Sequence, residues 1–222
     1  MDLFSALNNA SVIAALREEA ATVLREHNGI WTKQAVSKLY RLDSVIREST
    51  RMSGIGGTSM ARKVKVPGGM TLPDGTWVPE NNTIGVSMDG IHFDEEIYEN
   101  PLVFDPFRFS RPREMHKPGD KPLVNEDFVT TSTSFLPWTP WMVRLFFLSL
   151  RLGDPRANVS LFVLSPGRFF AANNLKIMFA HLLLNYEVEP FETRPPNISI
   201  DVISVVPMTA KMRIRRRVGE KV

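Results

Sequence analysis

The sequence predicts a mainly α-helical fold with a small mixed β region, an α+β architecture. Apolar side chains recur at the spacing of a buried helical face over 10–27, 39–52 and 171–185. Short extended runs lie between the second and third of these stretches, and Pro-Gly and Asp-Gly turn signals separate them. A chain of 222 residues is long enough for one domain or for two small ones.

Composition narrows the class of protein. Hydrophobic residues make up 43% of the chain, which is ordinary for a globular protein with a buried core. The net charge is +3 with both signs interspersed, so no nucleic-acid partner is predicted. The chain has no cysteine, which excludes disulfides and cysteine-ligated metals. The most apolar run, Trp141–Leu150, is too short to span a membrane and carries Arg144, so the chain as written is predicted to be cytoplasmic.

The first predicted helix covers Ala10–His27, after a short segment, 1–9, that is apolar on one side. Asn28-Gly29 is a typical end for such a helix. Thr32 is placed to cap a shorter helix over Lys33–Leu39. The predicted buried face of the first helix consists of Val12, Ile13, Leu16, Ala20, Val23 and Leu24.

The next predicted helix, Leu39–Met52, carries Glu48 and Arg51. Their i, i+3 spacing places both side chains on one face, close enough to form an ion pair. Taken alone, this pattern is weak, because E-x-x-R occurs by chance in many surface helices.

Extended runs follow at Gly57–Val66, Met70–Val78 and Thr83–Met88, with turn signals at 67–69 and 73–75. They predict a small β region of short strands. Further on, Arg111–Asn125 is polar and contains three prolines, which predicts a surface loop.

The last predicted helix is Ala171–Asn185, followed by a β-hairpin of Ile198–Val206 with Thr209–Val218. The arginines at 213–217 alternate with apolar residues, which favours an exposed strand over a nucleic-acid or import signal. The predicted buried face of the helix consists of Leu175, Met178, Phe179, Leu182 and Leu183.

Four motifs together resemble the cytochrome P450 family, the haem-thiolate monooxygenases, and in particular its fungal members. The segment 38–47 before Glu48 resembles the family's K-helix, and Phe104-Asp105-Pro106-Phe107-Arg108-Phe109 resembles its P-x-R-F motif. Phe135-Leu136-Pro137-Trp138 and the run 166–172, Pro-Gly-Arg-Phe-Phe-Ala-Ala, resemble the two ends of the family's cysteine-ligand loop. The resemblance implies the C-terminal half of a cytochrome P450-like fold, a partial domain over 1–222.

The family resemblance assigns roles to residues of this chain. Glu48, Arg51 and Arg108 would form a structural triad beneath the haem, joined by charge-assisted, bidentate hydrogen bonds. His92 lies in a pattern similar to the family's helix before the P-x-R-F motif, which is preferred over metal binding because the four histidines show no ligand spacing. The haem-binding candidates are Arg62, Trp138, Pro166 and Gly167, with an exposed strand charge as the equal alternative for Arg62. The substrate-lining candidates are Gly54, Ile55, Gly56, Ser204 and Val205.

The sequence departs from the family at the iron ligand. Ser165 stands where the axial cysteine is expected, so no catalytic residue is intact and no metal ligand is confirmed. The alternative for Ser165 is a plain helix cap. Residues 139–164 have no family counterpart and replace a short Gly-rich turn. They are interpreted as an atypical insertion, with a translated intron or faulty gene model favoured over a functional one.

The functional expectation follows from the resemblance. It implies a haem cofactor and monooxygenation of a lipophilic small molecule, in fungal secondary metabolism, with electrons from an NADPH-cytochrome reductase. Family members usually sit on the endoplasmic-reticulum membrane through an N-terminal anchor, which this sequence lacks. The competing hypothesis is a truncated, catalytically inactive pseudoenzyme or a mis-spliced product without haem.

Overall fold

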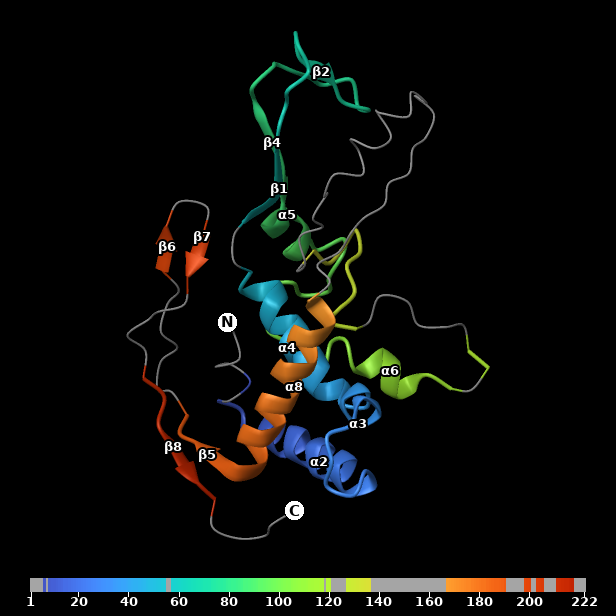
Figure 1. The fold of residues 1–222 in the computed structure, drawn as a ribbon, viewed down its shortest axis with the longest axis vertical. Helices are drawn as coiled ribbons and strands as arrows, with labels where there is room; N and C mark the ends of the chain where they lie inside the picture. Colours follow the sequence, from blue (N-terminus) through green and yellow to red (C-terminus); the bar gives the residue numbers. More distant parts are fainter. Residues whose placement is uncertain are drawn as a thin grey trace.

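In the computed structural model of the chain, three long helices enclose the core, and a β arm extends away from them (Figure 1). Helix α4 (Tyr40–Met52) lies beside α8 (Arg168–Asn185), and α2 (Ala10–Glu26) packs against both. The structure describes residues 6, 8–54, 57–117, 119–120, 127–136, 167–190, 198–200, 203–205 and 211–217.

Local capping explains where the first helices begin and end. Asn9 caps α2 by accepting hydrogen bonds from the backbone N–H groups of Ser11 and Val12. The helix is followed by Asn28 and Gly29, both with positive φ, as the sequence predicts. Thr32 caps α3 (Lys33–Ser37) through its hydroxyl, which accepts from Ala35 N at 3.1 Å. These two predicted helices are therefore confirmed, with the second ending earlier than expected.

The hydrophobic core lies among α2, α4 and α8 and extends to the segment 128–135. The predicted apolar face of α2 is buried, apart from Ile13, which is half-buried. Burial of this apolar surface is the main force that holds the three helices together. The buried members include Leu16, Val23, Leu39, Leu42, Val45, Ile46, Phe128, Phe135, Ala172, Ala180 and Leu183.

Helix α8 buries only part of the predicted face: Leu183 is buried, and Leu175 and Phe179 pack half-buried against the core. Its first residue is Arg168 and its N-cap residue is Gly167, while Ser165 lies outside the described residues. Met178 is 49% exposed, whereas Lys176 is buried with Ala172, Ala180 and Leu183. Small side chains allow α8 to approach its neighbours closely, and an ion pair draws the lysine inward. The spacing of apolar residues in the sequence does not predict this ion pair between Lys176 and Asp43.

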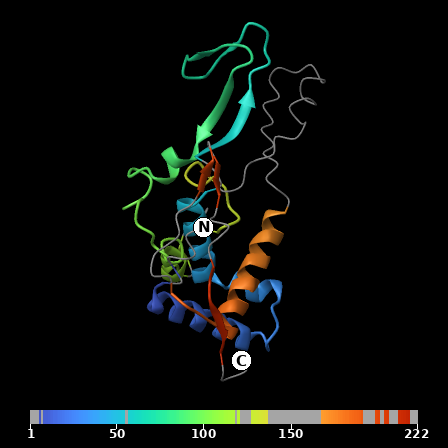
Figure 2. The ribbon, with the colours of Figure 1, turned by 90° about the vertical axis from the view of Figure 1, so that its left-hand side faces the viewer.

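A two-part β arm follows α4 and projects from the helices in both views (Figures 1 and 2). Strand β1 (Thr58–Lys63) pairs antiparallel with β4 (Thr83–Ser87). Beyond them, β2 (Met70–Thr71) pairs with β3 (Trp77–Val78). Helix α5 (Met88–His92) begins directly after β4 and returns the chain to the core. The predicted small β region is thus present, with shorter strands than expected.

The C-terminal strands do not form the predicted hairpin. Strand β6 (Ile198–Ile200) pairs with β7 (Ile203–Val205), while β8 (Ile214–Arg216) pairs with β5 (Tyr186–Val188) at the end of α8. Only two residues separate β6 from β7, so pairing these two strands closes a very short loop and costs little conformational entropy. The pairing of β8 with β5 is accompanied by ion pairs of Arg213 with Glu189 and of Arg217 with Glu187. The interpretation of 213–217 as an exposed strand segment is confirmed.

The predicted surface loop at 111–125 begins with a short helix, α6 (Arg111–Met115), so that part of the prediction is wrong. Pro112 stands in its first turn, where a missing N–H costs little. A proline in the first turn is compatible with a helix and does not by itself indicate a loop.

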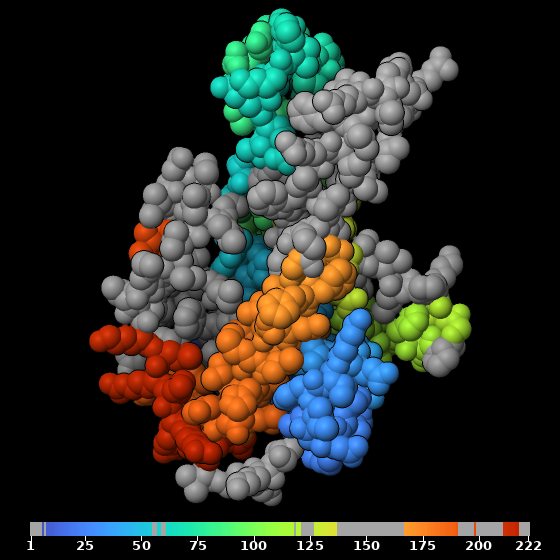
Figure 3. Space-filling view, viewed as in Figure 1, coloured from blue at the N-terminus to red at the C-terminus, as the bar shows by residue number. Residues whose placement is uncertain are grey.

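The surface view shows α8 as an exposed ridge between α2 and β8 (Figure 3). Phe169 and Phe170, in its first turn, are 53% and 73% exposed. Within the described ranges, no helix combines the length and the hydropathy needed to cross a membrane.

Candidate functional site

The carboxylate of Glu48 is completely buried and binds Arg51 in a bidentate manner. Arg51 Nε donates to Oε2 and Arg51 Nη2 donates to Oε1, each over 2.8 Å. Both residues lie on α4, one turn apart, which is why their side chains meet on one face. A planar guanidinium matches a carboxylate in this geometry, and the two groups neutralise each other in the core.

Arg108 reaches the same carboxylate from a segment sixty residues later. Its Nε lies 3.2 Å from Glu48 Oε1, and the backbone N–H of Asp105 donates to that oxygen at 3.1 Å. The remaining Arg108 donors bind the carbonyl oxygens of Glu99 at 2.6 Å and Val103 at 3.2 Å. The structure thus brings Glu48, Arg51 and Arg108 together, and we call these three residues the Glu48 network. It attaches the 99–108 segment to α4.

Aromatic rings surround the cations of this network. The Arg51 guanidinium lies 4.9 Å from the Tyr98 ring centroid and 5.8 Å from that of Phe93. Tyr98 also donates its hydroxyl to the carbonyl of Ser134 over 2.7 Å. Rings at these distances attract a cation through their quadrupole and exclude water from it.

His92 connects the network to the segment at Phe135 and Leu136. Arg51 Nη1 donates to the carbonyl of His92, and His92 Nε2 accepts from Leu136 N at 3.2 Å. The imidazole stacks on Phe135, with the ring centroids 5.6 Å apart. Burial, followed by the positive charge of Arg51, lowers the pKa of His92 to about 4, so the ring is neutral at physiological pH.

Arg47 is a core residue that sequence reasoning missed. Its guanidinium lies 4.1 Å from the Phe109 ring centroid and 4.3 Å from that of Phe135, and Nη1 donates to Asp127 O at 3.0 Å. A signal was present in the sequence. Charged residues recur every four positions at 43, 47 and 51, on the face of the helix that also carries Ser44.

Asp43 organises a second buried charge cluster. Its carboxylate accepts from Phe128 N at 2.9 Å, pairs with Arg113 at 3.2 Å and pairs with Lys176 at 3.0 Å. Three distant segments therefore meet at one side chain of α4. The sequence offered no local signal for this cluster, because its members are far apart in the chain.

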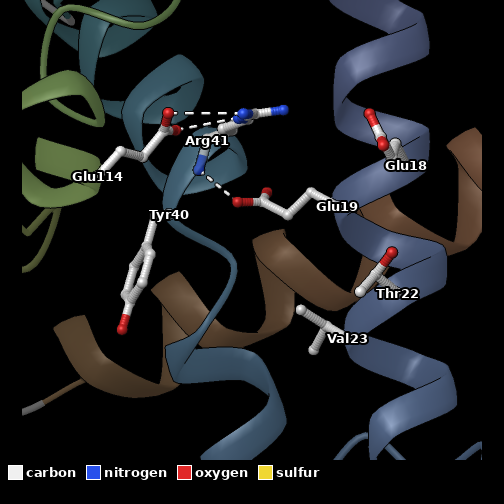
Figure 4. Close-up of a pocket in the computed structure, with 7 residues that line it drawn as sticks. All are labelled: Glu18, Glu19, Thr22, Val23, Tyr40, Arg41 and Glu114. Carbon is white, nitrogen blue, oxygen red and sulfur yellow. Dashed lines mark hydrogen bonds and ion pairs between the residues drawn. The ribbon is translucent and has the colours of Figure 1, made fainter.

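A pocket of about 280 Å³ opens between α2, the start of α4 and α6 (Figure 4). Glu19 lies at its edge and accepts hydrogen bonds from the backbone N–H groups of Arg41 at 2.7 Å and Leu42 at 3.0 Å. It replaces the side-chain cap that Leu39 cannot supply to α4. Burial raises the pKa of Glu19 to about 7, against the opposing effect of these two hydrogen bonds and of Arg41. Arg41 in turn binds Glu114 at 3.0 Å.

Only some of the haem-binding and substrate-lining candidates belong to the described residues. Arg62 is half-buried on β1 and donates to the neighbouring carbonyl of Ala61 at 2.8 Å. Gly54 follows α4, and Gly167 is the N-cap residue of α8. Ser204 and Val205 belong to the backbone of β7. Outside the described residues lie Ile55, Gly56, Trp138, Ser165, Pro166 and the segment 139–164.

The donor chemistry of this chain does not fit a haem held by a thiolate. The chain has no cysteine, and a serine hydroxyl is a weak ligand for haem iron. The Nε2 atom of His92 already accepts a hydrogen bond from the backbone. Among the residues described here, no three His, Cys, Asp or Glu side chains gather in a metal-binding arrangement.

Comparison with known proteins gives consistent matches. A family model described as Cytochrome P450 matches residues 2–137. Cytochrome P450 monooxygenase 71 of Postia placenta is 36% identical over 207 residues, which are 92% of this chain and 36% of that protein. Cytochrome P450 monooxygenase gloP of Glarea lozoyensis is 34% identical over 227 residues, covering 98% of this chain and 38% of that protein. The chain therefore spans a little over a third of the length of these curated relatives.

Proposed function

Because this chain belongs to the cytochrome P450 family, we propose that it is the structural, C-terminal portion of an oxidoreductase that monooxygenates a lipophilic small molecule. The observation that carries the proposal is the Glu48 network, which ties the P-x-R-F segment to the K-helix-like α4 as the family resemblance requires. In this proposal its role is to support the segment that leads toward position 165. The relatives reported above are cytochrome P450 monooxygenases, which supports the reaction class, and a secondary-metabolite type of substrate is part of the proposal.

The family cofactor is haem, which would supply oxygen activation with electrons from a reductase partner. The contribution proposed for this chain is structural. The Glu48 network and the aromatic rings around it form a water-excluding base, in which two arginines share one buried carboxylate. The substrate-lining role of 54–56 and 204–205, the haem contacts of Arg62 and Gly167, and an endoplasmic-reticulum location stay part of the proposal.

A second candidate function is favoured by one observation, the absence of any thiolate donor. In this alternative the chain as written is a catalytically inactive form that keeps the family scaffold. The family model stops at residue 137, just before the segment 139–164, which supports the interpretation of that segment as an insertion.

A chimera tests the proposal. A relative's N-terminal portion is joined to this chain, residues 139–164 are replaced by a short Gly-rich turn, and Ser165→Cys restores the thiolate. We expect the reduced, CO-bound chimera to show the red-shifted Soret band of a thiolate-ligated haem. The matched control keeps Ser165 and should lack that band. A chimera that folds and binds haem without ever showing it would contradict the assignment of position 165.

A further inference from the structure

We propose that His92 is a positioning residue, whose imidazole holds the backbone of Leu136 in place beside the Glu48 network. The importance of that placement rests on the proposed function, because Leu136 precedes the segment that leads to position 165. The contacts themselves do not depend on it.

A continuous chain of contacts joins the Glu48 network to the backbone of Leu136. Glu48 binds Arg51, Arg51 Nη1 donates to the carbonyl of His92, and the side chain of the same histidine accepts from Leu136 N at 3.2 Å. His92 thus engages the network with its backbone and the 132–136 segment with its ring. A shift of α5 relative to α4 would be passed directly to Leu136.

The 132–136 segment needs such an external contact. Its internal hydrogen bonds, from Phe135 N to Ser132 Oγ at 3.1 Å and from Ser132 N to Phe135 O at 2.9 Å, determine the shape of a turn. They do not determine where the turn lies. Its position is set by contacts that leave it, namely the buried Phe135 ring, the hydroxyl of Tyr98 on Ser134 O, and the imidazole of His92 on Leu136 N.

A histidine suits this task for a chemical reason. The side chain is only 1% exposed, and its Nε2 atom accepts a hydrogen bond, so the proton of the neutral ring resides on Nδ1. Phe135 stacks on the ring and restricts its orientation. A glutamine can place its amide oxygen near the position of Nε2 and keep the acceptor, whereas leucine fills similar space without one.

Amide hydrogen exchange on the full chain tests the proposal. In His92→Leu, we expect the Leu136 amide to exchange roughly 3- to 10-fold faster, the equivalent of one lost hydrogen bond, while amides in the middle of α4 change less. His92→Gln should return the Leu136 rate toward that of the wild type. His181→Gln is the matched control, because His181 is exposed on α8 and lies outside this chain of contacts.

Unchanged exchange at Leu136 in His92→Leu would overturn the proposal, as would an equal loss of protection at Leu136 and throughout α4. If His92→Leu does not fold, the wild-type chain still decides the question. A through-hydrogen-bond scalar coupling between the Leu136 backbone nitrogen and His92 Nε2 is expected by NMR. Its absence, or a ring with the proton on Nε2, would overturn the proposal. None of these readouts involves haem, so they can fail or succeed independently of the proposed function.

Discussion

At the residue scale, the stability of the folded chain is most sensitive to side-chain charges that are buried and paired. A buried ion pair is not in itself more stabilising than apolar side chains of the same size, because both ions lose their hydration. Removing only one partner is costly, since the other charge is then left in the core. The Glu48 carboxylate faces two arginines at once and is therefore the most sensitive single position of the network.

Glu48→Gln is expected to lower the free energy of unfolding by about 3–5 kcal/mol, because the buried guanidinium group of Arg51 and the half-buried one of Arg108 lose their counter-charge. Urea denaturation of both proteins measures the difference. Glu26→Gln is the control, because Glu26 pairs with Lys38 at an exposed site and should cost less than about 1 kcal/mol. Equal effects of the two substitutions would show that the Glu48 network does not stabilise the fold.

Glu19 predicts a dependence of stability on pH. Its folded-state pKa of about 7 lies above the ordinary value of 4.5, so the folded chain holds a proton that the unfolded chain releases. The contribution of Glu19 to the free energy of unfolding is therefore fully present below pH 4.5 and is lost as the pH rises through 7. The charged groups around it are Arg41 on α4, Glu114 on α6 and Glu18 on α2 itself.

The variant Glu19→Gln should remove this slope, which amounts to at most about 3 kcal/mol. The measurement is the free energy of unfolding of each variant across that pH range. Glu18→Gln is the matched control, because it removes a neighbouring charge and leaves both hydrogen bonds to α4 in place. A slope that persists in Glu19→Gln would mean that another group takes up the proton.

The Glu48 network was predictable from sequence, whereas the contacts of Asp43 and His92 were not. Glu48 and Arg51 are one helical turn apart, and Arg108 lies in a recognisable motif. Lys176 and Phe128 reach Asp43 from segments that carry no matching pattern, and Leu136 reaches His92 through a backbone N–H that any residue possesses. Non-local contacts of this kind follow from the tertiary fold.

At the element scale, periodicity located the helices and predicted the buried face of α2, but it predicted that of α8 only in part and did not determine which strands pair. Apolar spacing predicted α8, yet its buried face contains Ala172, Lys176 and Ala180 because neighbouring helices come close there. The hairpin prediction joined the two apolar runs nearest the C-terminus. The structure instead pairs β8 with β5, which continues directly from α8. Strand pairing depends on where the preceding helix ends, and a local pattern does not contain that information.

Lys176→Met tests the link between α8 and α4. It removes a charged partner of the buried Asp43, which keeps Arg113 and the Phe128 N–H, so we expect a loss of about 1–3 kcal/mol in the free energy of unfolding. Lys38→Met is the control, because it breaks only an exposed pair with Glu26. If both variants are as stable as the wild type, Lys176 does not contribute to helix docking.

At the scale of the whole molecule, the scaffold and the ligand chemistry disagree. The described core has the arrangement that the cytochrome P450 resemblance implies, with the Glu48 network joining α4 to the 99–108 segment. The chain nevertheless contains no cysteine, and residues 139–164 separate Trp138 from Ser165. The chain therefore keeps part of the cytochrome P450 scaffold without a cysteine that could supply the thiolate ligand of the family's haem iron.

The most direct measurement is an absorbance spectrum of the full chain after titration with haemin, reduction and addition of CO. A thiolate ligand shifts the Soret band to the red, because it donates electron density to the iron. We expect the chain as written to show no such band at any haemin concentration, even though its circular dichroism spectrum shows that it is folded. A thiolate-type spectrum from this cysteine-free chain would contradict the conclusion that the chain lacks the iron ligand of the family.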